Sequence, residues 1–457
     1  MRLASLVILS LCLLLQGARA PGVEKRESWP DGSHKARWSE DEQGRLDGVR
    51  EEYAANGVRT LLAEYKQGRK HGAWREWSPT GARLRFLSYK EGELDGRCEE
   101  FHPDGSSASV GDQRAGARHG KWIERSADGR RRRNLEYKAG LLHGELKIVQ
   151  DDKLLTRQQW KDGELFELDG RQPFPVRRDA LLAELRAILA QDAPEDPKDA
   201  QHAERLRALH RLQLYRRLCG LPWERMQLVP EWNLRCAAAA EVCRANGGLD
   251  HTPGMPPGFD EARFKLGYEG ASNSNLSRGT TLPRSIDGYM DDSDPSNIDR
   301  IGHRRWCLNP AMKRTGFGAA ADYSAMWSMD SSGPVKKGLS EVHYPPRGHV
   351  PVDLYSADRA FSIALWRGAA PRTEQLVVRV EPLDADWLVA GEPLELDHRA
   401  VAEGGYGGAP CIVFRAPRLR VEPGSACRVR ASFDGGKTFA HDYIVAFCEP
   451  VEAKAAR

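Results

Sequence analysis

Apolar and polar residues are interleaved in short segments along the first third of the chain, as in residues 73–77 (AWREW), and glycines separate these segments. Such segments are typical of β-strands. The glycines keep a step of 24 residues in three registers: Gly44, Gly68, Gly92, Gly116 and Gly140; Gly48, Gly72, Gly96, Gly120 and Gly144; and Gly57, Gly81, Gly105 and Gly129. Three registers with one period predict an N-terminal array of β-hairpin repeats over residues 40–165, stacked into an elongated sheet.

Glycine's freedom to adopt positive φ explains the spacing of these registers. Two glycines four residues apart predict a tight turn, and the third register predicts a second turn about nine residues later. The last unit is one residue short, because Trp160 and Gly163 precede their expected positions by one. Cys98 occupies the position of Trp74 and Trp122, so we expect it to be a packed side chain.

The pattern changes to helical periodicity after Gly170. We predict a helical linker over residues 171–198, with a helix at 178–190 that the sequence DAPEDP at 192–197 ends. Asp199 is a candidate N-cap for a second helix that ends at Gly220. Pro230 opens a third helix, which contains an alanine run and closes on glycine.

Residues 340–450 return to period-two alternation. Predicted strands cover residues 360–366, 375–381, 411–414, 427–433 and 439–447, and the sequence DGG at 434–436 predicts a hairpin turn. Short strands with turn signals and no helical pattern predict a C-terminal β-sandwich of immunoglobulin-like type.

The first 20 residues predict a secretory signal peptide. Arg2 precedes an apolar run from Leu3 to Leu15, and small residues at Ala18 and Ala20 offer two cleavage points. The run is shorter than the roughly 20 residues of a membrane-spanning helix, and we expect no transmembrane span. The protein is therefore expected to be secreted, periplasmic or part of the cell envelope.

Charge excludes one class of partner. The chain has 68 Lys and Arg against 65 Asp and Glu, a net charge of +3, and this balance argues against a nucleic-acid surface. Eight cysteines remain once Cys12 leaves with the signal, and an oxidising compartment would permit disulfides among them. One lies early, four centrally and three late, so at least one cysteine is expected to be free or paired between segments; Cys98 is our candidate.

Two parts of the chain resemble known families. The 24-residue units are similar to MORN-type repeats. Residues 199–330 resemble a bacterial domain of the CAP superfamily, which groups cysteine-rich secretory, antigen 5 and pathogenesis-related proteins. The matching segments are residues 249–253 (LDHTP), 267–270 (GYEG), 289–293 (YMDDS), 301–310 (IGHRRWCLNP) and 315–318 (TGFG). The resemblance implies a central α-β-α sandwich, and hence a multidomain fold class of hairpin array, α-β-α sandwich and β-sandwich.

The CAP resemblance also implies a cleft lined by two histidines and two acids. Carried over to this sequence, the ligand-binding residues are His251, Glu269, Asp292 and His303, with Asp292 preferred to Asp291. The chain departs from the family where Gly270 replaces the expected asparagine.

The cluster permits two kinds of chemistry. His251, Glu269 and His303 could hold a divalent cation such as zinc, although no cofactor is certain. The same groups could transfer protons or simply order a polar cleft. The chain lacks G-x-S-x-G and H-E-x-x-H motifs. We therefore predict a non-enzymatic binding protein whose partner is a cell-envelope component, a lipid or a protein. The alternatives are a metal-assisted hydrolase at this cluster and a scaffold built by the repeats.

Overall fold

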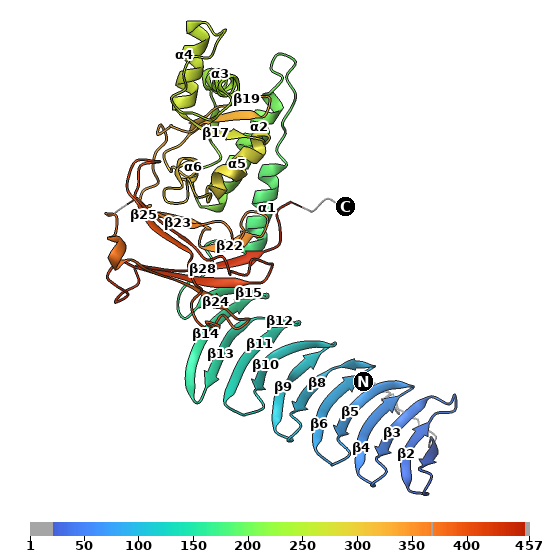
Figure 1. The fold of residues 1–457 in the computed structure, drawn as a ribbon. Helices are drawn as coiled ribbons and strands as arrows, with labels where there is room; N and C mark the ends of the chain where they lie inside the picture. Colours follow the sequence, from blue (N-terminus) through green and yellow to red (C-terminus); the bar gives the residue numbers. More distant parts are fainter. Residues whose placement is uncertain (1–21, 367–368, 453–457) are drawn as a thin grey trace, which may run out of the picture. The chain divides into compact units, whose positions relative to one another are not determined.

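The computed structural model describes residues 22–366 and 369–452, and the chain divides into two compact units, Met1–Arg171 and Gln172–Arg457 (Figure 1). The predicted signal peptide, residues 1–20, lies outside the described residues. Each unit is described by itself below.

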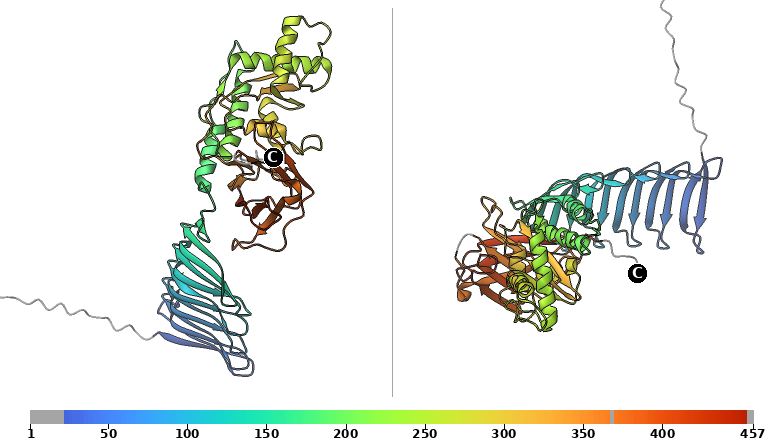
Figure 2. Two further views of the ribbon diagram at one scale, coloured as in Figure 1. Left: turned by 90° about the vertical axis from the view of Figure 1, so that its left-hand side faces the viewer. Right: turned by 90° about the horizontal axis from the view of Figure 1, so that it is seen from above.

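The first unit is one antiparallel sheet of 15 strands, which follow one another in chain order, as the blue-to-green colours show (Figure 2). The short strands β7 and β12 pair only with β6 and β11. The strands are β1 (Val23–Ser28), β2 (His34–Glu40), β3 (Leu46–Tyr53), β4 (Arg59–Lys66), β5 (Arg69–Trp77), β6 (Arg83–Lys90), β7 (Glu93–Leu94), β8 (Gly96–Phe101), β9 (Ser107–Arg114), β10 (Ala117–Arg125), β11 (Arg131–Lys138), β12 (Leu141–Leu142), β13 (Gly144–Gln150), β14 (Lys153–Lys161) and β15 (Glu164–Leu168).

Two-residue turns recur at the predicted glycines. At the turn between β4 and β5, Gln67 and Gly68 have φ of 52° and 81°, and between β9 and β10 Ala115 and Gly116 have φ of 48° and 76°. Two successive positive φ values define the turn that suits the right-handed twist of the flanking strands. The turn at Asp162 and Gly163 falls one residue short of the 24-residue step, as the sequence predicts.

Aromatic side chains in the repeats pack against their neighbours on the sheet. The Trp74 ring lies between Tyr65 and Tyr89, with centroids 6.2 and 5.8 Å away. Cys98 and Trp122, at equivalent repeat positions, are each 3% exposed. The prediction that Cys98 packs like the tryptophans is therefore confirmed.

The second unit contains the helices. They are α1 (Arg178–Leu189), α2 (His202–Leu218), α3 (Pro230–Asn246), α4 (Glu261–Ser272), α5 (Leu282–Asp291), α6 (Gly302–Cys307) and the 3₁₀ helix η1 (Thr373–Gln375). The third helix has Pro230 in its first turn and Gly247 at its C-cap with φ of 75°, as predicted. The second begins later than predicted, because its N-cap is Gln201 rather than Asp199. In the described part of the chain, no helix combines the length and apolarity that crossing a membrane requires.

Four sheets accompany these helices. A two-stranded sheet pairs β16 (Gln227–Leu228) with β18 (Arg314–Thr315), and a three-stranded sheet has the order β17 (Ser274–Arg278), β20 (Tyr323–Trp327), β19 (Phe317–Ala320). The first four-stranded sheet has the order β21 (Glu341–Tyr344), β23 (Phe361–Leu365), β26 (Cys411–Arg415), β25 (His398–Ala402). The second has the order β22 (Gly348–Pro351), β28 (His441–Cys448), β27 (Ala426–Ser432), β24 (Val377–Leu383).

The predicted fold class is wrong in its centre, because the described residues contain no separate central α-β-α sandwich. The largest hydrophobic core includes residues of α1, α2, α5 and both four-stranded sheets, whereas α3, α4 and β17 pack in a smaller core of their own. Tyr215 of α2, for example, packs against Tyr344 of β21, with ring centroids 6.2 Å apart. Periodicity shows which face of each helix is apolar but not which later strand covers it. Helices α1, α2 and α5 and the C-terminal strands therefore share one core, and the chain as a whole is mostly β because of its 15-stranded N-terminal sheet.

The disulfide prediction is also wrong. The eight cysteines of the described chain are all free: Cys98, Cys219, Cys236, Cys243, Cys307, Cys411, Cys427 and Cys448. All but Cys219 are buried. Cys236 and Cys243 are seven residues apart and share a buried face of α3, where they behave as small apolar side chains. Burial raises the pKa of Cys236 to about 12, which keeps its thiol protonated and unreactive.

Candidate metal centre

The strand β21 brings an acid and a histidine to one face of its sheet. Side chains alternate between the two faces of a strand, so Glu341 and His343 point one way while Val342 and Tyr344 point the other. Val342 and Tyr344 are buried in the main core, at 3% and 0% exposure. Glu341 and His343 are thereby fixed on the face that meets the second four-stranded sheet.

That second sheet supplies another histidine. His441 is the first residue of β28, and Tyr443, two residues later, lies on the same face. The Tyr443 ring stacks on His343, with centroids 4.3 Å apart and planes 11° from parallel. The stack sets the distance between the two sheets at this point and orients the His343 ring.

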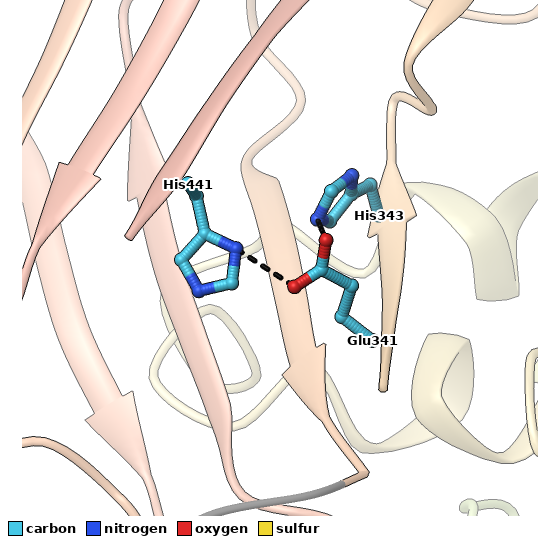
Figure 3. Close-up of side chains that lie close together, drawn as sticks. All are labelled: Glu341, His343 and His441. Carbon is cyan, nitrogen blue, oxygen red and sulfur yellow. Dashed lines mark ion pairs between the residues drawn. The ribbon is translucent and has the colours of Figure 1, made fainter. Parts of the chain in front are cut away.

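The carboxylate of Glu341 lies between the two imidazoles (Figure 3). Its Oε1 is 3.2 Å from Nε2 of His343, and its Oε2 is 2.8 Å from Nδ1 of His441. One ligand atom from each of the three residues lies within 4.8 Å of the others. Among residues 22–366 and 369–452, no other three His, Cys, Asp or Glu side chains meet this criterion.

The cluster is shielded from solvent. The side chains of His441 and His343 are 6% and 11% exposed, and that of Glu341 is 35% exposed. Although both rings are close to the carboxylate, neither Nε2 of His343 nor Nδ1 of His441 makes a hydrogen bond of acceptable geometry. Buried polar atoms are normally hydrogen-bonded, so two buried nitrogens whose contacts with a carboxylate lack hydrogen-bond geometry require an explanation.

Two residues that bind the same metal ion direct their donor atoms at the ion. Their donor atoms therefore lie side by side and do not form a hydrogen bond with each other. Two atoms each about 2.0–2.2 Å from a tetrahedral zinc ion are roughly 3.3–3.6 Å apart. The N···O separations of 2.8 and 3.2 Å are within about 0.8 Å of that spacing. Two imidazoles and one carboxylate also form the three-ligand set of catalytic zinc sites, which leaves one position open.

The ionisation states suit metal binding. Burial acts to raise the pKa of Glu341, but the adjacent His343 and His441 outweigh it and hold that pKa well below its usual value. Burial lowers the pKa of His343, although the Glu341 carboxylate opposes the shift. At neutral pH the carboxyl is thus ionised and the His343 imidazole neutral, which are the forms that ligate metals.

The residues expected from the CAP resemblance are only partly brought together. His303 Nδ1 lies 2.8 Å from Oδ1 of Asp292, a buried residue with 4% exposure. Asp291 instead lies 3.8 Å from Arg359. The acid that contacts His303 is therefore Asp292.

His251 and Glu269 have other partners. Nδ1 of His251 is 2.9 Å from the carbonyl oxygen of Ala271, and Glu269 accepts a 3.0 Å hydrogen bond from Arg235 of α3. No group of three close metal-ligand atoms within the described residues contains His251, Glu269 or His303. The ligand atoms of the three sequence-predicted residues therefore do not all lie within 4.8 Å of one another.

Packing explains the departure at Gly270. A Cβ atom at Gly270 would lie 2.1 Å from the carbonyl oxygen of Arg235, so α4 approaches α3 more closely than a side chain would allow. The alanine run of α3 faces this contact. The asparagine expected at position 270 would not fit between these two helices.

The GHRRWCLNP segment is held by buried arginines. Arg304 donates 2.7 Å hydrogen bonds to the carbonyl oxygens of Met290 and Ala360. Arg216 of α2 donates to the carbonyls of Cys307, Asn309 and Met312 at 3.0, 2.8 and 3.1 Å. These contacts give the segment a structural role in joining α2, α6 and the first four-stranded sheet.

Sequence reasoning missed the Glu341–His343–His441 cluster. Its local signal is an acid and a histidine two residues apart in a short apolar strand, E-V-H-Y. The third residue comes 98 positions after His343, inside a strand that the sequence predicts but to which it gives no partner. The comparisons with known proteins add no guide, since neither a family model nor a curated protein matches the chain.

Proposed function

We propose that this chain is an exported binding protein whose second unit holds a divalent transition-metal ion at Glu341, His343 and His441. Zinc is the first candidate, because it accepts two imidazoles and a carboxylate and leaves a fourth position for a ligand. The observation that carries the proposal is the convergence of two buried imidazole nitrogens on the two oxygens of one carboxylate, in contacts that lack good hydrogen-bond geometry.

The open position distinguishes this centre from a purely structural one. Structural zinc sites are closed by four protein ligands. Among the residues that the structure describes, three donors converge here, and Glu341 and His343 also line a pocket that reaches the surface. An ion in the cluster would therefore be accessible to a small molecule, as a ligand-binding role requires.

A metal-assisted hydrolase at His251, Glu269 and His303 has less support. Glu269 is engaged by Arg235, and His251 by a backbone carbonyl. Asp292 orients the imidazole of His303, but the described residues around this pair form no group of metal ligands.

The test is zinc titration of the full chain by isothermal calorimetry after removal of bound metal. We expect one zinc ion per chain. The double variant His343→Ala/His441→Ala should weaken binding by more than the 10–100-fold that loss of a supporting partner of a ligand costs. His303→Ala is the matched control, and it should bind zinc like the parent. Loss of binding in the control but not in the double variant would refute the proposal.

A further inference from the structure

A pocket adjoins the metal centre within the second unit. It has a volume of about 260 Å³, and Glu341 and His343 form part of its wall. His441 is not among the lining residues, and its side chain is 6% exposed. A metal ion held by all three residues would present its open position toward this pocket.

One cation of the pocket has no acidic partner. Arg347 lines the pocket and donates hydrogen bonds to the backbone carbonyl oxygens of Pro173, at 3.3 Å, and Gln172. Within the described residues, no carboxylate lies at ion-pair distance from it. Arg217, the other arginine of the wall, is neutralised by Glu184.

The rest of the wall is largely apolar. Pro175, Val176, Leu181, Leu218 and Pro346 contribute to it. Pockets for drug-sized ligands have volumes of about 300–1,000 Å³, so a 260 Å³ pocket suits a smaller molecule. Apolar surface on such a molecule would be stabilised by about 25 cal/mol per Å² removed from water.

We propose that this pocket takes a small organic carboxylate, whose charged group occupies the open metal position beside Arg347 while its apolar body packs against the Leu181 and Leu218 wall. The inference rests on the proposed metal site and names the class of ligand that the site receives. A carboxylate matches a planar guanidinium and a zinc ion at once, because both bind its oxygens.

Inorganic phosphate fits the pocket less well. Phosphate sites in proteins combine several cations or a helix N-terminus with backbone N–H donors. This pocket offers one unneutralised arginine and a mostly apolar wall. An anion without an apolar part would leave that wall in contact with water, so we expect phosphate to bind more weakly than an aryl carboxylate.

The experiment compares phenylacetate, phenylacetamide and inorganic phosphate by calorimetry, using the full chain loaded with one equivalent of zinc. We expect phenylacetate to bind at least tenfold more tightly than either of the others. Arg347→Gln should weaken phenylacetate binding at least tenfold without changing zinc affinity, and Arg347→Lys should restore part of it. Arg420→Gln is the control, since Arg420 is 76% exposed and does not line the pocket.

The outcomes separate the two proposals. Zinc binding without phenylacetate binding, or equal binding of phenylacetate and phenylacetamide, overturns the ligand class and leaves the metal site standing. Tighter binding of phosphate than of phenylacetate overturns it as well. If the chain binds no zinc, both proposals fail. If Arg347→Gln alters the thermal unfolding temperature, its phenylacetate affinity is not used. The phenylacetate affinity of Arg347→Lys is compared with that of the parent instead, because lysine keeps the charge.

Discussion

The imidazole of His343 stacks on the phenol ring of Tyr443, 4.3 Å away, although the two residues belong to different sheets. The contact joins the strands that carry the metal ligands. The Tyr443 hydroxyl is buried without a hydrogen-bond partner, so the ring rather than the hydroxyl supports the site.

Tyr443→Phe should therefore keep zinc affinity and leave stability unchanged or raised, because an unsatisfied buried hydroxyl costs about 1–3 kcal/mol. Tyr443→Ala should lower the free energy of unfolding by about 3–5 kcal/mol and weaken zinc binding. Urea denaturation and calorimetry measure both effects. A loss of zinc affinity in Tyr443→Phe equal to that in Tyr443→Ala would show that the hydroxyl is needed.

The close contact of α3 and α4 makes a second prediction. Gly270→Ala places a Cβ atom 2.1 Å from the Arg235 carbonyl oxygen and should destabilise the protein by about 1–3 kcal/mol. Gly288→Ala in α5 is the matched control, because nothing lies within 4 Å of its added Cβ and glycine is unfavourable in helices. Equal stability of the two variants in urea would contradict the packing described here.

A third prediction concerns the acid stability of the second unit. Burial lowers the pKa of His349 to about 4, and the charge of Arg178 adds to the shift. Between about pH 6.5 and 4 the unfolded chain binds more protons at this residue than the folded chain, so stability falls as the pH falls through that range. His349→Gln removes this contribution. Its stability relative to the parent should therefore rise on going from pH 7 to pH 4, by up to about 3 kcal/mol.

Urea unfolding at several pH values checks this difference. Comparison with the parent at each pH removes the contribution of every other titrating group. A difference between the two proteins that is the same at pH 7 and pH 4 would mean that His349 titrates normally in the folded state.

The hairpin turns of the first unit provide a fourth prediction. Ala115 has φ of 48°, a conformation that asparagine tolerates better than alanine. Ala115→Asn should stabilise this part of the sheet by about 0.5–1 kcal/mol, measured as slower amide hydrogen exchange in β9 and β10 of the full chain. The control is Ala127→Asn, at a turn position without positive φ, where no such gain is expected. Equal protection in both variants would contradict the turn assignment.

Local order could be predicted from the sequence wherever one residue type has a strong backbone preference. The 24-residue glycine step located the turns, including the slip at Gly163, and Pro230 and Gly247 bounded α3. These features depend on the dihedral angles of single residues. The contact of Asp292 with His303 could also be predicted from the sequence, because the two residues are only 11 positions apart.

Long-range packing could not be predicted in the same way. Nothing in the apolar faces of α1 and α2 indicates that strands more than 100 residues later cover them. The sequence resemblance therefore predicts a separate central sandwich that the described residues do not form. The same limit hid the metal cluster, since Glu341 and His441 meet only because two sheets pack face to face. The eight free cysteines show likewise that an oxidising compartment, although it permits disulfides, does not bring two thiols within bonding distance.

Anomalous X-ray diffraction at the zinc absorption edge, on crystals of the full chain grown with zinc, tests the central claim most directly. The account predicts one strong anomalous peak at about 2.0–2.2 Å from Nε2 of His343, Nδ1 of His441 and a carboxylate oxygen of Glu341. A peak at His303 and Asp292 with none at Glu341 would contradict the account, and so would the absence of any peak.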